Sequence, residues 1–377
     1  MSIPVQYHTD GFPPTNINWP ALIPLIGPAN RAVARYDGLL GAIPSPGVLL
    51  SPLMTQEAVL SSRIEGTQTT MGEVLEFEAE GDNEQISDTK RGDIEEVLNY
   101  RKAMHCAVKL MRELPLCQRV LKETHAVLLD GVRGHSKAPG SYRKIPNWIG
   151  PAGCNIENAR YIPIAVNALP DAIARWERYI HEDAPDCLVQ LAVIHAEFEA
   201  LHPFLDGNGR LGRMLVPLFM YQRGLLSEPM FYISAFLERN RDEYYERLLA
   251  ISRDGDWTQW IGFFLRAITE QARENQTKTQ AIRDLYDETA RRIATISHSQ
   301  YSIHAAEFLF TRPIFRASDF YHAPSMTPAS GRRILNLLLQ NSFFQVIRPA
   351  SGSSSAILAY RELLNITEGR DVFDDSK

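Results

Sequence analysis

The most informative stretch of this sequence is LHPFLDGNGRLGR, residues 201–213. It gathers one histidine, one aspartate, three glycines and two arginines between two segments in which apolar residues recur at helical spacing. Pro203 disfavours helical geometry at the residue before it, so the first helix is predicted to end near Leu201. We therefore expect two helices joined by a turn that carries reactive side chains, with Phe204 as the apolar residue that packs the turn onto the core.

The residue types in this turn indicate phosphate chemistry. Glycines let the backbone approach a ligand, and a helix beginning near Arg210 would direct its free N–H groups and positive dipole end at the turn. Arg210 and Arg213 add charges suited to phosphate oxygens, and Asp206 is the kind of ligand that Mg²⁺ takes beside phosphates. His202 ordinarily titrates near neutrality and can accept a proton from an attacking hydroxyl. Together these groups predict in-line attack on a phosphorus atom.

A zinc site is the main alternative for the same region. His195, Glu199 and His202 lie at i, i+4 and i+7, on one face of a helix, as zinc ligands can. However, Pro203 ends that helix, no H-E-x-x-H pattern is present, and a zinc hydrolase has no need for the two arginines. We therefore interpret His195 and Glu199 as core residues.

The composition is that of an ordinary globular protein, and a length of 377 residues indicates two or three domains. A net charge of -6 provides no general attraction to nucleic acid or to an anionic membrane. Residues 1–20 lack the pattern of a signal peptide, and no run is long and apolar enough for a membrane span. The four cysteines are widely spaced, which favours buried, reduced thiols over a disulfide framework. We expect a cytoplasmic protein.

Helical periodicity dominates the chain. Helices are predicted at 19–74 with an interruption at 41–52, and at 94–114, 118–129, 169–181, 187–201, 211–221, 239–251 and 257–296. A polar arm is expected at 4–18 and a polar loop at 78–90. Segment 131–163 is rich in Gly, Pro and Asn and contains a short β-like run at 144–149, which predicts a hairpin or flap.

The block from about Ser299 onward has a different pattern. It predicts helices at 303–310, 316–321 and 327–340, followed by short strands at 343–349 and 356–360. The third helix has Thr327 as its N-cap and Pro328 at its first helical position. Three helices followed by two short strands are the order of elements in a winged helix. The block contains eight Lys and Arg against seven Asp and Glu, and the cations on its third helix that suit phosphate contacts are Arg332 and Arg333. DNA binding is therefore no better supported than protein binding.

Residues 202–213 match the Fic-domain signature H-P-F-x-[D/E]-G-N-G-R-x-G-R at every fixed position, so the chain resembles the Fic family. Further Fic-like stretches are HAEFE at 195–199, GSYR at 140–143, NWIG at 147–150 and NRDEYY at 240–245. The resemblance covers about 19–265 and implies a mainly α fold, with a Fic helical core and a small β-hairpin flap. Together with the pattern of the C-terminal block, it divides the chain into an N-terminal region with an inhibitory helix (1–95), a Fic catalytic core (96–265), a connecting helix (266–298) and a C-terminal winged-helix-like domain (299–377).

Most Fic proteins transfer AMP from ATP to a Ser, Thr or Tyr hydroxyl of a protein target. By motif position, the resemblance implies His202 as the base, Asp206 as the Mg²⁺ ligand and Arg213 as the γ-phosphate ligand. Doc-like relatives that transfer the γ-phosphate carry lysine at the position of Gly209, so the resemblance favours AMP transfer. The other implied nucleotide-binding residues are Gly207, Asn208, Gly209, Arg210, Leu211 and Gly212, with Tyr244 and Tyr245 near the adenine. The flap residues Lys144, Ile145, Asn147, Trp148 and Ile149 would hold the target segment by strand addition.

A second motif suggests autoinhibition. SSRIEG at 61–66 matches the Fic inhibitory pattern [S/T]-x-x-x-E-[G/N], and 56–64 is predicted to be a helix with Gly66 at its C′ position. Glu65 would then meet the negative end of the helix dipole, at a cost of ~0.3–1 kcal/mol, which a cationic partner would offset. The resemblance supplies Arg213 as that partner and Ser61 as a member of the motif. Glu65 would deny Arg213 to the γ-phosphate of ATP.

Three questions stay open at this point. Removal of AMP from a modified protein, with Glu65 orienting a water molecule, uses the same residues. A regulator that binds DNA through the winged helix is the other alternative. The target, which includes the protein itself as a candidate, and the assembly state, with a homodimer as one option, are not determined by the sequence.

Overall fold

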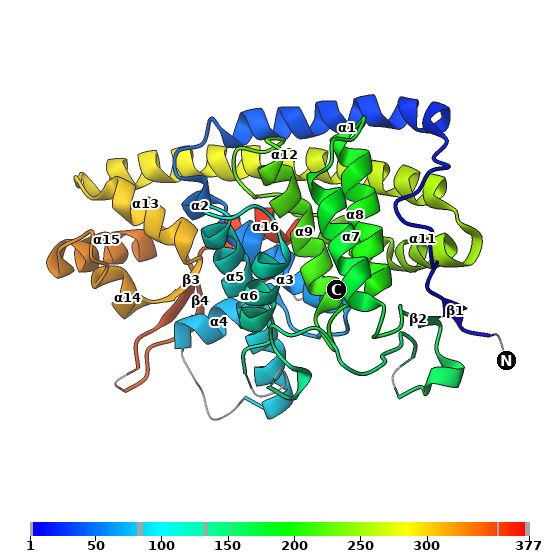
Figure 1. Cartoon of the computed structure of the whole chain (residues 1–377). Helices are drawn as coiled ribbons and strands as arrows, with labels where there is room; N and C mark the ends of the chain where they lie inside the picture. Colours follow the sequence, from blue (N-terminus) through cyan, green and yellow to red (C-terminus); the bar gives the residue numbers. More distant parts are fainter. Residues whose placement is uncertain (1–2, 81–85, 132–134, 152, 353, 374–377) are drawn as a thin grey trace. The chain divides into compact units, whose positions relative to one another are not determined.

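The computed structural model describes residues 3–80, 86–131, 135–151, 153–352 and 354–373 (Figure 1). Helices make up most of the described chain, so the predicted mainly α class is confirmed. No helix within the described ranges has the length and apolar character needed to cross a membrane. Four cysteines are free thiols, as expected: Cys106, Cys117, Cys154 and Cys187. Each is partly exposed, whereas burial was predicted.

The chain packs into two compact units that interleave along the sequence. Unit 1 comprises residues 1–38, 60–67 and 98–273, and unit 2 comprises residues 39–59, 68–97 and 274–377. The predicted boundaries after 95, 265 and 298 remain a prediction about domains, and these packing units do not follow them.

Unit 1 is built around α8 (Cys187–Leu201), which packs against α7 (Leu169–His181) and α9 (Asn208–Gln222). Leu188, Leu191 and Ile194 of α8 are fully buried, because this helix is enclosed by its neighbours. The N-cap Asp186 accepts hydrogen bonds from the backbone N–H groups of Leu188 and Val189, both at 2.9 Å. The other elements that lie wholly in unit 1 are β1 (Val5–Gln6), α6 (Gln118–Leu128), η1 (His135–Lys137), η2 (Ile156–Asn158), β2 (Tyr161–Ile162), α10 (Ser234–Arg239) and α11 (Arg241–Asp254).

Four helices have residues in both units: α1 (Trp19–Leu40), α3 (Ser51–Ile64), α5 (Asp88–Leu110) and α12 (Trp257–Ser297). The predicted extents of α7 and α8 are confirmed to the residue. The helix predicted at 239–251 is α11, which begins at Arg241, and Arg239 is the last residue of the preceding helix α10. Of the loop predicted at 78–90, residues 81–85 lie outside the described chain, and helical residues flank the gap as far as Glu80 and from Asp88.

The flap does not contain the predicted strand at 144–149. Only Ile149 takes part in β pairing, through an isolated antiparallel bridge to Tyr161. Pro146 has no N–H to contribute to a ladder, and Ile145 is 59% exposed, so this segment is irregular. The neighbouring sheet consists of β1 and β2, which pair in parallel with Val5 opposite Tyr161.

Unit 2 contains an antiparallel sheet of order β3-β5-β4, formed by β3 (Ile314–Arg316), β5 (Ile357–Ala359) and β4 (Gln345–Arg348). Helices α13 (Ser302–Thr311), α14 (Ala317–Tyr321) and α15 (Pro328–Gln340) occur at the three predicted places, and the Thr327 side chain caps α15 as expected. Strand β3 was not predicted. Helix α4 (Met71–Glu80) packs on β3, α2 (Pro46–Leu49) packs on α13, and α16 (Arg361–Glu368) follows β5. The winged-helix assignment stays a prediction.

The two arginines of α15 have partners within unit 2. Arg333 donates a hydrogen bond of 2.8 Å to the carbonyl of Ser297, the last residue of α12. The guanidinium of Arg332 lies 5.0 Å from the ring centroid of Tyr321. Arg333 therefore stabilises a helix end, which leaves fewer cations for the phosphate contacts considered above.

Substitution Gly331→Ala should destabilise unit 2. A Cβ atom on Gly331 would lie 2.6 Å from Cα of Tyr321, so α15 would have to move away from α14. Overpacking of this kind costs about 1–3 kcal/mol, against roughly 1 kcal/mol that alanine gains over glycine within a helix. Denaturant unfolding of the full chain should show a lower midpoint, whereas Asn336→Ala on the exposed face of the same helix should not. A midpoint for Gly331→Ala at or above that of the unsubstituted protein would contradict the close packing.

Candidate active site

The turn at residues 201–213 begins with a left-handed residue. His202 is the C-cap of α8, with φ 46 and ψ 60, and its backbone N–H donates to the carbonyl of Phe198 at 3.1 Å. The helix thus ends at Leu201 as Pro203 predicts, but His202 is left-handed and not extended. Arg143 is 97% buried and stabilises this helix end, because its Nε donates to the carbonyl of His202 at 3.0 Å.

An aromatic contact and an amide side chain hold the turn in place. Phe204 is fully buried and stacks on the ring of His125 with centroids 3.7 Å apart, which confirms it as the apolar residue that packs the turn on the core. The Asn208 side chain accepts from the N–H of Phe204 and donates to its carbonyl, both at 2.9 Å. Asn208 therefore organises the turn through its side chain, a role that the motif alone does not reveal.

His125 was not predicted as a site residue. Its Nδ1 accepts from the N–H of Gly140 at 2.9 Å, so its Nε2 carries the proton and donates to the carbonyl of Asp206 at 2.9 Å. Burial lowers the pKa of His125 to about 4, which keeps this neutral form. A histidine within an ordinary helical pattern gives no signal of such a role in the sequence.

Helix α9 starts at Asn208, two residues earlier than predicted, and Gly207 precedes it with φ 76. The first N–H groups of a helix have no carbonyl partners within it, so the start of α9 is the kind of place that can accept an anion. The Asp206 carboxylate accepts from the N–H of Gly207 at 2.6 Å and from Nη2 of Arg210 at 3.3 Å, and 44% of its side chain is exposed. Arg210 is almost fully buried, as is Leu211.

Arg213 is bound to the predicted inhibitory segment. Its Nε donates to Oγ of Ser61 at 2.8 Å, and its Nη2 donates to the carbonyl of Ser61 at 2.8 Å and to Oε1 of Glu65 at 2.7 Å. The guanidinium is 1% exposed, whereas 36% of the Glu65 side chain is exposed. Burial opposes ionisation of Glu65, but the charge of Arg213 outweighs it and lowers the pKa of Glu65. The pair is therefore ionised at neutral pH.

The end of α3 has the predicted geometry. Gly66 has φ 107, its N–H donates to the carbonyl of Arg63 at 2.9 Å, and the N–H of Thr67 donates to the carbonyl of Ser62 at 3.2 Å. These two bonds form a Schellman motif, with Gly66 at the C′ position. The motif turns the chain directly after Glu65.

Two glycines of α9 make room for carboxyl groups. A Cβ on Gly209 would lie 2.1 Å from Oε1 of Glu65, and a Cβ on Gly212 would lie 2.3 Å from Oε1 of Glu199. Any side chain at position 209 would thus displace Glu65. Glycine at these two positions therefore lets the carboxyl groups of Glu65 and Glu199 pack directly against α9.

His202 remains neutral in this environment. Its Nδ1 lies 3.3 Å from the carbonyl of Glu199, which places the ring proton on Nδ1 and leaves the Nε2 lone pair free to accept a proton. Burial lowers the pKa of His202 to about 4, although the Glu65 carboxylate acts in the opposite direction. The expectation that His202 titrates near neutrality is therefore wrong for the protein without a ligand.

The residues of the zinc alternative are otherwise engaged. His195 is fully buried, with Nδ1 3.0 Å from the carbonyl of Gly212 and Nε2 2.8 Å from the hydroxyl of Tyr244. Both ring nitrogens are thus used within the core, as interpreted from the sequence. Glu199 is different, because its buried Oε1 has no hydrogen-bond partner among the described residues, and burial raises the pKa of Glu199 to about 8. This carboxyl is protonated at neutral pH.

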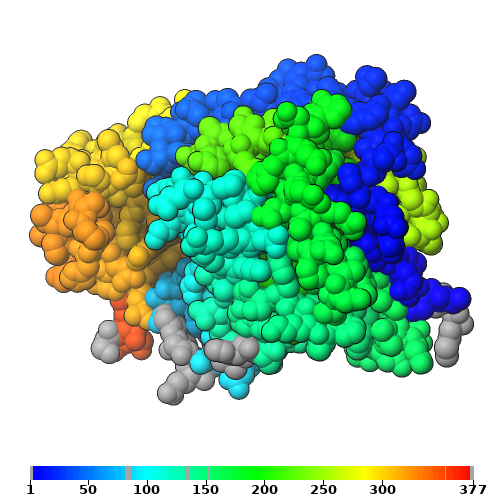
Figure 2. All heavy atoms as spheres, in the orientation of Figure 1, coloured from blue at the N-terminus to red at the C-terminus, as the bar shows by residue number. Residues whose placement is uncertain are grey.

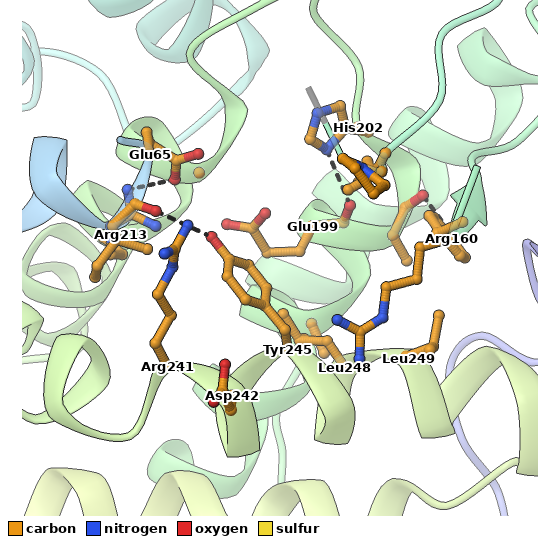
Figure 3. A pocket seen from close by; sticks show the side chains of 18 residues that line it. Glu65, Arg160, Glu199, His202, Arg213, Arg241, Asp242, Tyr245, Leu248 and Leu249 are labelled. Carbon is orange, nitrogen blue, oxygen red and sulfur yellow. Dashed lines mark hydrogen bonds and ion pairs between the residues drawn. The ribbon is translucent and has the colours of Figure 1, made fainter. Parts of the chain in front are cut away.

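A cavity of about 530 Å³ connects these groups (Figure 3). Glu65, Glu199, His202, Gly209 and Arg213 line it on one side. The side formed by α11 contributes the residues Arg241, Asp242, Tyr245, Leu248 and Leu249. Tyr245 lines the cavity, whereas Tyr244 does not and has its hydroxyl bound to His195.

Arg160, Ile149 and Tyr161 also line the cavity, and Arg160 carries no sequence signal of this placement. The flap residues Asn147 and Trp148 are tied down by side-chain bonds. Asn147 donates to the carbonyl of Phe204 at 3.1 Å, and the Trp148 indole donates to the carbonyl of Cys154 at 2.8 Å. The apolar side chains of Ile145 and Trp148 remain exposed. Lys144 is exposed as well.

The protein is thus a helical protein whose His-Pro-Phe turn and following glycines lie between two core helices. Models of the Fic/DOC family match the chain twice, at 23–109 for the N-terminal region of the family and at 115–220 for the Fic/DOC domain. A crystal structure of a Fic family protein from Desulfovibrio desulfuricans aligns with a TM-score of 0.60 at 19% identity, over 92% of this chain and 98% of that chain. The chain belongs to the Fic/DOC family.

Two curated relatives carry the name of an activity. A probable protein adenylyltransferase of Aquifex aeolicus is 37% identical over 86 residues, which are 23% of this chain and 24% of that protein. The protein adenylyltransferase Fic of Drosophila grimshawi is 22% identical over 210 residues, which are 53% of this chain and 38% of that protein. The chain thus spans well under half of the length of either relative.

Substitution Glu199→Gln should make stability less dependent on pH. An unfolded glutamate titrates near pH ~4.3, so between about 5 and 8 the folded protein holds a proton that the unfolded chain lacks. The free energy of unfolding then falls as pH rises, by up to about 1.4 kcal/mol per pH unit, and glutamine removes this slope. Thermal unfolding from pH 5 to 8 should show a growing advantage of Glu199→Gln over the parent protein. Glu157→Gln, at an exposed glutamate of unit 1, serves as control, and a constant difference for Glu199→Gln would refute buried protonation.

Proposed function

We propose that this protein transfers AMP from ATP to the hydroxyl of a serine, threonine or tyrosine in a protein target. The observation that carries the proposal is the neutral His202, whose free Nε2 lies on the cavity that also contains Arg213 and the first turn of α9. The hydroxyl oxygen attacks the α-phosphorus, its proton passes to Nε2 of His202, and pyrophosphate leaves. The relatives named protein adenylyltransferase support this choice of reaction.

The residues of the turn fit a triphosphate and a magnesium ion. The N–H groups at the start of α9 and the arginines at 210 and 213 provide the positive charge that phosphate oxygens require. Asp206 offers a half-exposed carboxylate beside this anion site, which is the donor that Mg²⁺ uses together with phosphates. Bound there, Mg²⁺ would neutralise charge on the phosphates. Tyr245, Leu248 and Leu249 supply apolar contact area in the cavity for the adenine.

The flap is proposed to hold the target. Ile145 is 59% and Trp148 is 42% exposed, in the flap that lines the cavity through Ile149. Exposed apolar side chains favour docking of a partner segment. Because the flap backbone is extended at Ile149, a target segment can add to it with little demand on its own sequence.

Glu65 is proposed to inhibit the transfer. It occupies Nη2 of Arg213, and its Oε1 lies where any side chain on Gly209 would be. A γ-phosphate that needs Arg213 must displace this carboxylate, so ATP cannot take the productive position while Glu65 is in place. Glycine at position 209 is also compatible with AMP transfer and unlike the lysine of Doc-like relatives.

Removal of AMP from a modified protein is the second candidate. Glu65 lines the cavity with a third of its side chain exposed, so it can also orient a water molecule there. Incubation with an AMP-modified protein separates the two reactions, since only this candidate releases free AMP without added ATP. DNA binding receives less support, because Arg333 is bound to the end of α12.

Substitution Glu65→Gly should raise AMP transfer between about 5-fold and 150-fold, the range of a typical coupling between two sites. The reason is that Arg213 becomes available to the γ-phosphate. The measurement is incorporation of AMP from labelled ATP with Mg²⁺ into lysate proteins, with mass spectrometry to locate the modified hydroxyl groups.

The matched control is the double variant Glu65→Gly/His202→Ala, which retains the open Arg213 but lacks the base. Its transfer should fall to background. AMP transfer that survives in the double variant would refute the role of His202, and an unchanged rate in Glu65→Gly would refute inhibition by Glu65.

A further inference from the structure

The segment before α1 is paired with the edge of the flap region. Strand β1 lies parallel to β2, with the N–H of Val5 donating to the carbonyl of Arg160 at 3.2 Å and the N–H of Tyr7 donating to the carbonyl of Ile162 at 3.0 Å. We call residues 3–18 the N-terminal arm. In the space-filling view the arm, in deep blue, runs along the surface beside green segments of unit 1 (Figure 2). The arm precedes the family match, which begins at 23.

Tyr161 joins the arm to the flap. On its other side, the N–H of Ile149 donates to the carbonyl of Tyr161 at 2.9 Å, and the N–H of Tyr161 donates to the carbonyl of Ile149 at 3.0 Å. Val5, Tyr161 and Ile149 thus lie opposite one another on three adjacent backbone segments, with Tyr161 in the middle. At the other end of the flap, the N–H of Arg143 donates to the carbonyl of Pro203 at 2.9 Å. The backbone of the flap is held at its two ends.

Side chains fix the arm to α8, the helix that ends directly before His202. The Tyr7 hydroxyl donates to Oε1 of Glu197 at 2.6 Å, and Nε2 of His8 lies 2.9 Å from Oε2 of the same carboxylate. Glu197 is fully buried in α8, five residues before His202. A buried carboxylate with two partners is costly to disturb, so the arm has one defined position.

The same network reaches Tyr161 and α11. Nδ1 of His8 lies 2.7 Å from Oγ of Ser252 in α11, and the Tyr161 hydroxyl donates to the carbonyl of Ala200 at 3.0 Å. The ring of His8 also contacts Trp257 edge-on, with centroids 5.4 Å apart. Arm, β2 and α8 therefore form one hydrogen-bonded assembly, with the flap attached at Ile149.

We propose that Tyr7 and His8 are positioning residues, which set the flap at a defined place relative to His202 by fixing the outer edge of β2. The inference rests on the proposed role of the flap in holding the target. Without the arm, Tyr161 is paired on one side only, and the bridge to Ile149 loses its rigid support. The target hydroxyl would then be held less accurately in front of His202, while the nucleotide site on α9 keeps its contacts.

The experiment compares variants of the full chain in the Glu65→Gly background. Tyr7→Phe/His8→Leu removes both contacts to Glu197, whereas His8→Gln with Tyr7 retained keeps a hydrogen-bonding side chain at position 8. Gln6→Ala is the matched control, since Gln6 is an exposed residue of β1 whose backbone pairing persists. The first measurement is hydrogen exchange at the amides of Ile149 and Tyr161 without nucleotide. The second is AMP transfer to lysate proteins at saturating ATP, together with the Kd of ATP and Mg²⁺.

We expect faster exchange at both amides and a transfer rate lower by about 3- to 10-fold in Tyr7→Phe/His8→Leu, the size expected for losing one or two ordering hydrogen bonds. The Kd of ATP should stay within about twofold of the parent value, and His8→Gln should recover most of the loss. Unchanged exchange at Ile149 and Tyr161, or a weakening of ATP binding equal to the loss in rate, would overturn the proposal.

The two proposals can fail separately. If the Glu65→Gly parent transfers no AMP but the exchange at Ile149 rises in the arm variant, the proposed activity fails and the positioning of the flap stands. If Tyr7→Phe/His8→Leu does not fold, the same measurements are made on Tyr7→Phe, which removes a single oxygen atom.

Discussion

The buried charge of Arg213 is the constraint around which unit 1 is arranged. A guanidinium with 1% exposure needs partners for its donors, since an uncompensated charge in the core costs several kcal/mol. Ser61 and Glu65 supply them from the end of a helix far away in the sequence. The Schellman motif at Gly66 turns the chain immediately after Glu65, and the lack of a side chain on Gly209 leaves room for the carboxylate.

The same physical principle explains the histidines around the turn. His125, His195 and His202 are all shielded from water, which disfavours the charged ring, and the pKa of each is lowered by burial. For His125 and His195 both ring nitrogens have partners within the protein, so these rings organise structure. His202 differs because one nitrogen faces the cavity. The same imidazole ring thus has a structural or a proposed catalytic role, depending on how many of its nitrogens are hydrogen-bonded within the protein.

Local patterns predicted several features to the residue. The ends of α7 and α8, the C′ position of Gly66 and the N-cap at Thr327 follow from periodicity, glycine and capping rules that act within a few residues. The flap was predicted as a strand at 144–149 but pairs only at Ile149, because its partner lies in a different segment and Pro146 interrupts the ladder. Strand β3 was missed for a related reason, since a strand of three residues is defined by its neighbour β5.

The sequence by itself determined the family, the mainly helical class and the identity of the reactive turn, because these depend on residue types at short, fixed spacings. It also suggested Glu65 as a partner of Arg213, through a motif and an unfavourable place on a helix dipole. Only the tertiary structure decided which protonation states the groups adopt, since burial sets the pKa of His202 and Glu199. Only the tertiary structure brought the arm to β2, His125 to Asp206 and Arg160 to the cavity, because these contacts join segments that no local rule connects.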